Sequence, residues 1–379
     1  MGDIIFRPKV LGTEADWAYM KRAFDLAKKG IGYVNPNPLV GAVIVKDDIV
    51  IGEGYHERYG EAHAEVNAFN SCTESPEGAT MYVTLEPCSH YGKTPPCVDM
   101  VIEKGISRVV IGSVDPNPLV AGRSVNKMKE AGIEVLVGVL DRYCDPLNKV
   151  FFHYIIHKTP YVVMKYAMTI DGKIATRTGK SKWITSEYAR ERVHEDRNLY
   201  TAIMVGVGTV IADDPMLDCR LEGGRNPIRI LCDTTLRTPI TARVIQTASE
   251  IPTILATSCT DATKHQPYLD LGCQIMVVPE HDGTIDLKRL MVQLGDANID
   301  GILLEGGATL NAAALKAGVV HKIQTYIAPK IFGGADAPTP VAGLGIDHPD
   351  QAYLLKNRKT TTLGEDILIE SEVVLCSQD

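Results

Sequence analysis

The sequence predicts an α/β protein built from two domains, and three observations support this prediction. In both halves of the chain, short runs of β-branched apolar residues alternate with segments of helical periodicity, which is the pattern of a largely parallel sheet covered by helices. The 379 residues suffice for two domains of ordinary size. Between residues 141 and 160 the alternation is interrupted. We therefore expect one domain over residues 1–157 and a second over residues 158–379.

Composition and charge narrow the class of protein. Hydrophobic residues make up 45% and charged residues 23%, as in soluble globular proteins. The net charge of −8 argues against a broad basic surface for nucleic acid. Nine cysteines without the spacing of a secreted disulfide framework favour a reducing compartment. The N-terminus lacks the apolar core of a signal peptide, and no apolar run approaches the roughly 18 residues of a membrane span. We therefore expect a cytoplasmic protein with neither nucleic-acid nor membrane partners.

The first domain is expected to begin with a helix. Thr13 and Asp16 have the spacing of a capping box, and apolar residues at helical intervals follow until Gly30. Two apolar runs, Leu39–Val45 and a second from Ile49, flank a polar turn and predict a hairpin. The remaining expected elements are helix Glu61–Asn70, strand Ala79–Leu85, helix Pro96–Lys104, strand Arg108–Val114, helix Gly122–Gly132, strand Ile133–Val137 and a short helix Leu147–His157.

The second domain is expected to open with strand Tyr161–Met168 and to continue the same alternation. Its predicted helices are Ser186–Asn198, Leu287–Leu294 and Thr309–Ala317. Its further predicted strands are Ala202–Val207, Ile228–Cys232, Thr253–Ala256, Gln274–Val278, Gly301–Leu304, Lys322–Ala328 and Ile367–Leu375.

The clearest chemical motif combines His63 with Cys88 and Cys97, each cysteine preceded by a proline. One imidazole and two thiols suit a Zn²⁺ ion with three protein ligands and a fourth position for water. Glu65, two residues after His63 in the first turn of the same predicted helix, is placed to act as general acid and base. The order H-x-E…P-C…C is the signature of zinc-dependent nucleobase deaminases. The alternative is a purely structural zinc site, with His90 as a fourth ligand.

The segment between the two cysteines points to the kind of substrate. Most such deaminases have two residues between the cysteines, whereas eight separate Cys88 from Cys97 here. These eight residues include His90, Lys93 and hydroxyl groups, and they end at the start of a predicted helix. Such groups bind phosphate. The insertion therefore favours a small phosphorylated substrate over a free nucleoside or a base in a nucleic acid.

The first half resembles a known family. The run T-L-E-P-C-S-H-Y-G-K-T-P-P-C, together with N-P-N-P, H-A-E-V and D-P-N-P, is similar to the deaminase domain of the bifunctional riboflavin-biosynthesis deaminase/reductases. The resemblance implies a cytidine-deaminase-like α/β/α fold, one zinc ion on His63, Cys88 and Cys97, and Glu65 as the proton shuttle. It implies deamination at C2 of 2,5-diamino-6-ribosylamino-4(3H)-pyrimidinone 5′-phosphate. The positions that match substrate contacts are Asn37, His56, His90 and Lys93.

Two glycine-containing segments in the second half follow predicted strands. Gly306 and Gly307 come after the run from Ile302, at the start of a predicted helix, and Gly206–Thr209 follows another strand. Glycines allow close backbone approach, and a helix start attracts phosphate. The Gly306–Gly307 segment is not a G-x-G-x-x-G fingerprint, and a plain turn is the simpler interpretation of that motif alone.

The second half also resembles this family. The runs K-Y-A-M-T-I-D-G-K-I-A, S-K-W-I-T-S, V-G-V-G-T-V-I-A-D-D-P, L-D-C-R and L-E-G-G are similar to its reductase domain. The resemblance implies a dihydrofolate-reductase-like fold and NADPH-dependent reduction of the ribosylamino product to the ribitylamino compound. The matching cofactor positions are Ala167, Trp183, Thr209, Asp213, Gly307, Ala308, Thr309, Leu310, Asn311, Ala312 and Ala313. The matching substrate positions are Lys165, Ser181, Arg197, Leu217, Arg220 and Glu305, of which the two arginines suit a phosphate.

Two other functions compete with the bifunctional enzyme. A tRNA-adenosine deaminase shares H-A-E and the Pro-Cys motif, but it has the short cysteine spacing and usually a basic surface. A non-enzymatic protein with a zinc-stabilised domain and a nucleotide-sensing module is disfavoured by Glu65 and the open zinc position. The choice between NADPH and NADH does not follow from the sequence. The family resemblance suggests a homo-oligomer, either a dimer or a tetramer.

Overall fold

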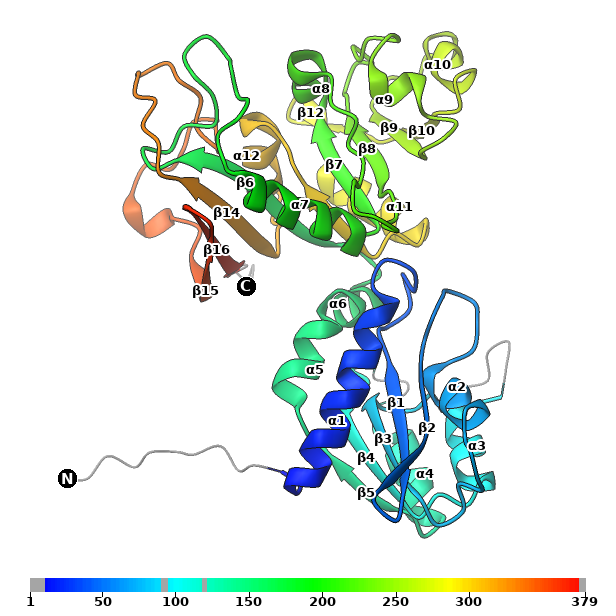
Figure 1. Ribbon diagram of the computed structural model, residues 1–379. Helices are drawn as coiled ribbons and strands as arrows, with labels where there is room; N and C mark the ends of the chain where they lie inside the picture. The colour runs from blue at the N-terminus through cyan, green and yellow to red at the C-terminus, as the bar shows by residue number, and fades with distance from the viewer. Residues whose placement is uncertain (1–10, 90–94, 118–120, 375–379) are drawn as a thin grey trace, which may run out of the picture. The chain divides into compact units, whose positions relative to one another are not determined.

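The computed structural model describes residues 11–89, 95–117 and 121–374. It divides into two compact units, Met1–His157 and Lys158–Asp379 (Figure 1). Each unit has hydrophobic cores of its own. No helix in the described ranges is long and apolar enough to cross a membrane.

The first unit contains a five-stranded sheet with the order β2-β1-β3-β4-β5. Strands β3, β4 and β5 are parallel, whereas β1 runs antiparallel to both β2 and β3. The predicted hairpin forms as β1–β2, so the sheet is mixed rather than largely parallel. The strands are β1 (Gly41–Lys46), β2 (Ile49–Tyr55), β3 (Thr80–Leu85), β4 (Arg108–Ser113) and β5 (Glu134–Val137).

Helices cover both faces of this sheet (Figure 1). They are α1 (Glu14–Ala27), followed by the short η1 (Lys28–Gly30), α2 (Ala64–Asn70), α3 (Cys97–Glu103), α4 (Arg123–Glu130), α5 (Asp141–Leu147) and α6 (Lys149–His157). Because successive strand residues point to opposite faces, β1 contributes to two cores. Ala42 and Ile44 pack with α2, α3 and α4, whereas Val43 and Val45 pack with α1 and α5. The unit is therefore an α/β/α sandwich.

The first helix shows how local sequence produces this packing. Thr13 and Asp16 form the predicted capping box, since the Asp16 N–H donates to Thr13 Oγ1 at 3.1 Å and the Thr13 N–H donates to Asp16 Oδ2 at 2.9 Å. The helix then lies directly against β1. A Cβ atom at Gly41 would meet the carbonyl oxygen of Ala23 at 2.0 Å, so only glycine permits this close approach.

The second unit contains a nine-stranded sheet with the order β10-β9-β8-β7-β13-β6-β14-β16-β15. Neighbouring strands from β10 to β14 are parallel, and β16 and β15 add an antiparallel edge. The strands are β6 (Tyr161–Thr169), β7 (Ala202–Gly206), β8 (Ile228–Cys232), β9 (Thr253–Thr257), β10 (Gln274–Val277), β13 (Gly301–Leu304), β14 (Lys322–Ala328), β15 (Leu355–Leu363) and β16 (Asp366–Val373). A separate small ribbon pairs β11 (Glu280–His281) with β12 (Thr284–Ile285).

Helices again lie on both faces of the sheet (Figure 1). Met204 and Ile230 pack with α11 and α12, whereas Ile203 and Leu231 pack with α8, α9 and α10. The helices are α7 (Glu187–Leu199), α8 (Val207–Asp213), α9 (Arg243–Gln246), α10 (Ala262–Leu269), α11 (Leu287–Asp296) and α12 (Ala308–Lys316), and the chain also forms a short η2 (Pro349–Gln351).

Three sequence expectations for local structure are wrong. Strand β7 ends at Gly206 rather than Val207, because Val207 opens helix α8, a helix that we did not expect. The region before residue 158 holds two helices, α5 and α6, instead of one. His63 was expected inside the first turn of a helix, but α2 begins at Ala64 and His63 is its N-cap.

Candidate active sites

The predicted zinc ligands come together in the first unit. Cys88 follows the carboxyl end of β3, Cys97 is the first residue of α3, and His63 precedes α2. The Nδ1 atom of His63 lies 3.3 Å from Cys97 Sγ and 3.6 Å from Cys88 Sγ. All three donor atoms lie within 4.8 Å of one another. We call His63, Cys88 and Cys97 the zinc-ligand cluster. A tetrahedral zinc ion with bonds of about 2.0–2.3 Å separates its donor atoms by about 3.5 Å, so this group fits Zn²⁺.

The surroundings of Cys88 favour its thiolate, the form that binds a metal. The Cys97 backbone N–H donates to Cys88 Sγ at 3.2 Å. Hydrogen bonding from the Cys97 side chain lowers the pKa of the Cys88 thiol to about 4, with a further contribution from His63. In the described ranges no fourth His, Cys, Asp or Glu joins the cluster. His90, the fourth ligand of the alternative structural site, lies outside the described residues, as does Lys93.

Glu65 lies in the first turn of α2 and is 3% exposed. Burial raises the pKa of its carboxyl group to about 7, and the negative charge of Cys88 adds to the effect. A carboxyl group with this pKa both accepts and releases a proton near neutral pH. This is the property of a general acid and base.

Asn37 and His56 lie beside the zinc-ligand cluster. The ring of His56 is 5.6 Å from the ring of His63, centroid to centroid. His56 is 2% exposed; its Nδ1 lies 3.0 Å from the carbonyl oxygen of Ala62, and its Nε2 lies 3.1 Å from Asn37 Nδ2. Burial lowers the pKa of His56 and so favours the neutral ring. A neutral ring that donates from Nδ1 accepts at Nε2, which fixes the orientation of the Asn37 amide.

Sequence reasoning missed a role for Glu86, which stands between β3 and Cys88. Glu86 is 4% exposed, and its carboxylate accepts hydrogen bonds from the Gly122 N–H at 3.0 Å and from Ser124 Oγ at 2.5 Å. It thereby attaches the start of α4 to the segment between β3 and Cys88, a predicted zinc ligand. The signal in the sequence was a charged residue at the end of a buried apolar strand.

The second unit holds a buried ionic cluster formed by Lys165, Arg197 and Glu305. Arg197 donates from Nε and Nη2 to the two oxygens of Glu305 at 2.8 Å and 3.1 Å, and Lys165 Nζ lies 3.6 Å from the same carboxylate. Burial opposes ionisation of Glu305, but Arg197 and then Lys165 outweigh it and lower the pKa of Glu305 to about 2. The three residues come from β6, the end of α7 and the residue after β13, so only the fold brings them together.

Next to this cluster, two neighbouring strands lead through glycines into helices. Strands β7 and β13 are parallel neighbours, and they lead through Gly206 and Gly307 into α8 and α12. A Cβ atom at Gly307 would lie 3.2 Å from Thr209 Oγ1, so the two chain segments approach closely. Asn311, in the first turn of α12, is fully buried; its Nδ2 donates to the Pro340 carbonyl, and its Oδ1 is a buried atom without a partner among the described residues.

We call Gly206, Thr209, Gly307 and Asn311 the dinucleotide cradle. The first turn of α12 offers backbone N–H groups without a capping side chain, and these suit phosphate oxygens. The amide oxygen of Asn311, which has no partner among the described residues, is available to accept a hydrogen bond from a hydroxyl or amide group of a ligand. The residues present therefore fit a nicotinamide dinucleotide.

Comparison with known proteins assigns the chain to a family. Residues 160–369 match the RibD C-terminal domain, and residues 13–113 match the cytidine and deoxycytidylate deaminase zinc-binding region. The chain is 53% identical to the riboflavin biosynthesis protein RibD of Actinobacillus pleuropneumoniae, over 96% of each chain. The chain belongs to the RibD family. It is also 40% identical to RibD of Escherichia coli strain K12, over 93% of this chain and 98% of that one.

Solved structures of RibD proteins have the same fold. Acinetobacter baumannii RibD matches with a TM-score of 0.85 and 36% identity, covering 95% of this chain and 99% of that one. A Thermotoga maritima protein, described as a diaminohydroxyphosphoribosylaminopyrimidine deaminase/5-amino-6-(5-phosphoribosylamino)uracil reductase, matches with a TM-score of 0.82 and 38% identity, covering 95% and 99% of the two chains. The predicted fold class of a deaminase domain followed by a reductase domain is confirmed.

Membership in the RibD family also confirms the predicted activity at the level of the domains. The chain is an enzyme of riboflavin biosynthesis with a zinc-binding deaminase domain and an NADPH-using reductase domain. It acts on small molecules, and the matches indicate neither a nucleic-acid nor a membrane partner. This finding decides against the nucleic-acid-editing and non-enzymatic alternatives.

The other residues predicted for the RibD reductase site differ in their surroundings. Ser181 Oγ donates to Asp213 Oδ1 at 3.3 Å. Trp183 is 61% exposed, with the Arg190 guanidinium 4.5 Å from its ring centroid, so it is not a core residue. Ala167 lies partly buried on β6 beside Tyr326. Ala308, Thr309, Leu310, Ala312 and Ala313 form the start of α12 with Asn311.

Leu217 and Arg220 lie on one loop after α8. The Leu217 side chain is buried in the core between the sheet and α8–α10. Arg220 is exposed and pairs with Asp218. The carbonyl oxygen of Asp218 accepts from Arg197 Nη1 at 2.9 Å, which ties this loop to the ionic cluster. Sequence reasoning missed Asp218, because its role depends on a backbone atom.

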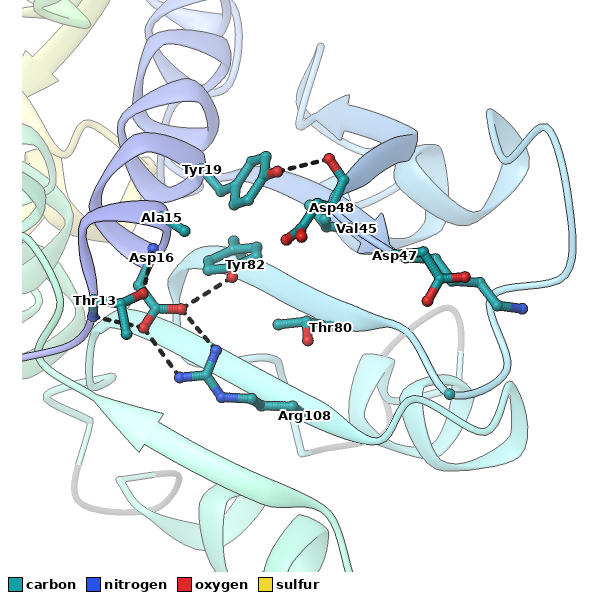
Figure 2. A pocket seen from close by; sticks show the side chains of 12 residues that line it. Thr13, Ala15, Asp16, Tyr19, Val45, Asp47, Asp48, Thr80, Tyr82 and Arg108 are labelled. Carbon is teal, nitrogen blue, oxygen red and sulfur yellow. Dashed lines mark hydrogen bonds and ion pairs between the residues drawn. The ribbon is translucent and has the colours of Figure 1, made fainter.

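The first unit also has a hollow of about 410 Å³ (Figure 2). It is lined by the start of α1, the β1–β2 turn and the amino ends of β3 and β4, whereas Cys88 follows the carboxyl end of β3. Figure 2 shows the Asp16 carboxylate between Tyr82 and Arg108, which both donate to it. This arrangement is a structural ion pair at the edge of the sheet.

Proposed function

We propose that the first unit deaminates 2,5-diamino-6-ribosylamino-4(3H)-pyrimidinone 5′-phosphate and that the second reduces the resulting 5-amino-6-(5-phosphoribosylamino)uracil with NADPH. The observation that carries this proposal is the Thermotoga maritima relative described by these two activities, which is 38% identical and aligns over 95% of this chain. The two clusters of residues described above support it, since each contains the groups that its reaction needs.

In the deaminase unit, His63, Cys88 and Cys97 hold the zinc ion, which when bound activates water for hydrolysis. Glu65 would accept a proton from the attacking water and deliver it to the ring nitrogen of the pyrimidine. It would then accept the proton of the hydroxyl group newly bonded to the carbon and pass it to the amine, which departs as ammonia. Its pKa of about 7 supports both directions of transfer. Asn37 and His56 orient the substrate, and Lys93 and His90 bind its phosphate end.

In the reductase unit, the cradle and the residues predicted with it hold NADPH, which when bound supplies the reducing equivalents. Glu305 stays ionised and accepts a hydrogen bond from the substrate, while Lys165 donates to the sugar. We assign the phosphate to Arg220, which is exposed, rather than to Arg197. The donors of Arg197 are already engaged with Glu305 and the Asp218 carbonyl, and this supports a positioning role.

A coupled assay on the purified zinc-loaded protein tests the proposal. The diaminopyrimidinone substrate is supplied with and without NADPH, and ammonia release and NADPH absorbance are followed. Ammonia without NADPH, and NADPH consumption only after deamination, is the expected result. Ammonia release alone would contradict the reductase assignment, and neither signal with zinc bound at one per chain would contradict both.

We also propose that the enzyme forms homo-oligomers, either dimers or tetramers. Strand β15 supports this, since it is an edge strand with mostly exposed residues beside exposed apolar side chains at Leu354 and Ile367. Light scattering coupled to size-exclusion chromatography measures the mass, and a monomer at micromolar concentration would contradict the proposal.

We further propose that the enzyme works in the cytoplasm. The eight cysteines within the described ranges are free, which supports a reducing compartment. Fractionation of the source cells, with detection of the protein in the cytosolic fraction, is the test.

A further inference from the structure

The second half of α7 carries polar groups that bind the loop after α8. Arg197 Nη1 donates to the Asp218 carbonyl at 2.9 Å. About one helical turn earlier, His194 Nδ1 accepts a hydrogen bond from the Arg220 N–H at 3.3 Å, and the His194 carbonyl accepts one from Cys219 Sγ at 3.5 Å. Two residues of one helix therefore hold three consecutive residues of the loop.

The bond from the Arg220 N–H determines the protonation of the His194 ring. A backbone N–H is always a donor, so Nδ1 must offer its lone pair, and the single proton of the neutral ring then lies on Nε2. Burial lowers the pKa of His194, and the positive charges of Arg197 and Arg220 lower it further. Asp218 and Glu305 act in the opposite sense without reversing the shift. The surroundings thus favour the ring form that the Arg220 bond requires.

Arg220 depends on this bond for its attachment to α7. Its side chain is 60% exposed, and its guanidinium pairs with Asp218 of the same loop, with Nη2 at 3.2 Å from Oδ1. A pair within one loop does not fix that loop relative to a helix, whereas the bond to His194 does. A long, flexible side chain binds a ligand well only when its backbone is held in place.

We propose that His194 is a positioning residue of the reductase, which holds the backbone of Arg220 and thereby keeps its guanidinium at the phosphate of the substrate. This inference rests on the proposed reductase function, and it deepens it by naming a residue that acts through Arg220. His194 contributes to the binding of a phosphorylated substrate and takes no part in the transfer of reducing equivalents.

Three substitutions of His194 test whether the Nδ1 acceptor is what matters. The Oδ1 atom of asparagine is the same number of bonds from Cα as Nδ1, the oxygen of glutamine is one bond farther, and alanine has no acceptor. In His194→Ala and His194→Gln we expect the KM for 5-amino-6-(5-phosphoribosylamino)uracil to rise about threefold to tenfold, the effect of one lost hydrogen bond. The kcat should stay within about twofold, and His194→Asn should restore most of the lost affinity.

A ligand without the phosphate shows whether the effect reaches the substrate through Arg220. Isothermal titration calorimetry on the full-length protein compares the Kd of the reductase substrate with that of its dephosphorylated riboside. In His194→Ala the Kd of the phosphorylated ligand should rise by the same factor as the KM. The Kd of the riboside should not change, because Arg220 has no phosphate to bind.

The pH dependence of KM provides a second readout. Protonation places a hydrogen on Nδ1, which then no longer accepts the Arg220 N–H. From about pH 7 to about pH 5, the KM of the wild type should therefore rise more steeply than that of His194→Asn, which does not titrate. The substrate phosphate titrates near pH 6 with both proteins, so the ratio of the two KM values isolates the contribution of His194.

His265→Ala is the matched control. His265 lies on α10 of the same unit, and its Nε2 is 2.8 Å from the carbonyl oxygen of Cys259, so this variant also loses a contact between a histidine and the backbone. It should lower the melting temperature about as much as His194→Ala without changing the KM or either Kd. The comparison separates positioning of Arg220 from a general loss of stability.

An unchanged KM in His194→Ala, or equal weakening of the phosphorylated and dephosphorylated ligands, would overturn the proposal. Failure of His194→Asn to recover affinity would also overturn it, because the Nδ1 acceptor would then not be the group that matters. A wild-type protein that reduces the substrate normally while giving these results keeps its proposed function. A wild type that consumes no NADPH with this substrate would instead overturn the proposed reductase function and this inference with it.

Discussion

Two buried glutamates, one in each unit, have pKa values shifted in opposite directions. Burial raises the pKa of Glu65 to about 7, with Cys88 adding to the shift, and the charge of His63 offsets only part of it. Burial acts in the same sense on Glu305, but Arg197 and Lys165 reverse it and lower the pKa to about 2. A carboxyl group with a pKa near 7 carries protons, whereas one that stays ionised at neutral pH positions cations and accepts hydrogen bonds. The charges around each glutamate thus predict its role.

The proton-carrier role of Glu65 is tested by Glu65→Gln. Glutamine keeps the size of the side chain but carries no ionisable proton, so we expect ammonia release to fall by about 10²- to 10⁴-fold. Zinc content, measured by atomic absorption, should remain at one per chain. NADPH consumption with supplied reductase substrate should be unchanged, because that site lies in the other unit. Normal ammonia release by this variant would rule out Glu65 as the shuttle.

The fixed-anion role of Glu305 is tested by Glu305→Gln. The substitution leaves the buried Arg197 and Lys165 without their counter-ion, and we expect kcat/KM for reduction to fall by about 10²-fold or more. Since the pKa of about 2 lies below the value of 4.5 for a free glutamate, the carboxylate contributes stability above pH 4.5 and loses this contribution as the pH falls toward 2. The wild-type reductase rate should therefore show no titration of Glu305 between about pH 5 and 9.

Glu370→Gln is the matched control for this prediction. Glu370 is also nearly buried and pairs with Lys322 at 2.7 Å, but it lies on β16, outside the ionic cluster. We expect this variant to lower the melting temperature without changing the KM for either reductase ligand. If both variants lost reductase activity to the same extent, Glu305 would have only a structural role.

Individual residues were predictable where the chemistry depends on spacing along the chain. His63, Cys88 and Cys97 form a cluster whose types and order are visible in the sequence. Glu86 was not predicted. It acts by holding Gly122 and Ser124, so its role depends on contacts between distant segments.

At the scale of elements, the packing of α1 on the first sheet depends on one ion pair. Asp16 accepts hydrogen bonds from Arg108 Nη1 at 2.7 Å and from the Tyr82 hydroxyl at 3.0 Å, while also capping α1 through Thr13 (Figure 2). Burial opposes its ionisation, but the bonds from Arg108, Thr13 and Tyr82 outweigh burial and hold the pKa of Asp16 well below its usual value of 3.8. The carboxylate links a helix to two strands.

Asp16→Asn should lower the free energy of unfolding by about 3 kcal/mol at neutral pH, because it leaves the partly buried Arg108 guanidinium with only the exposed Glu134 as a counter-ion. The difference in free energy of unfolding between wild type and variant should be full above pH 3.8, the ordinary pKa of Asp. It should shrink as the pH falls below that value, because the pKa of Asp16 is lower in the folded state than in the unfolded state. Urea unfolding at several pH values measures this. Asp25→Asn, which changes an exposed pair on the same helix, should stay within about 0.5 kcal/mol. Equal effects at both positions would contradict the argument.

The elements that sequence reasoning missed are those without a strong periodic signal. Helix α9 has only four residues, and helix α10 contains Pro267, so neither shows the pattern of an amphipathic helix. Strand β15 reads L-K-N-R-K-T-T-T-L, and most of its side chains are exposed on both faces. An edge strand with little burial on either face carries no alternation of polar and apolar residues. In contrast, the buried strands β8, β13 and β14 have the predicted bounds.

At the scale of the whole molecule, the two activities use separate parts of the chain. The zinc-ligand cluster and Glu65 belong to Met1–His157, and the ionic cluster and the cradle belong to Lys158–Asp379. The main hydrophobic cores are also separate, since each draws its residues from one unit. We therefore expect a perturbation of one site to leave the chemistry of the other unchanged.

Zinc removal is the most direct test of this separation. Treatment with a chelator should abolish ammonia release, because the Cys88, Cys97 and His63 donors lose the ion that activates water. NADPH consumption with supplied 5-amino-6-(5-phosphoribosylamino)uracil should continue at the original rate, and added Zn²⁺ should restore ammonia release. His63→Ala should give the same pattern without a chelator, which separates loss of the metal from any effect of the chelator on the reductase. If zinc removal also stopped NADPH consumption, the reductase unit would depend on the folded deaminase unit, and the two sites would not be independent.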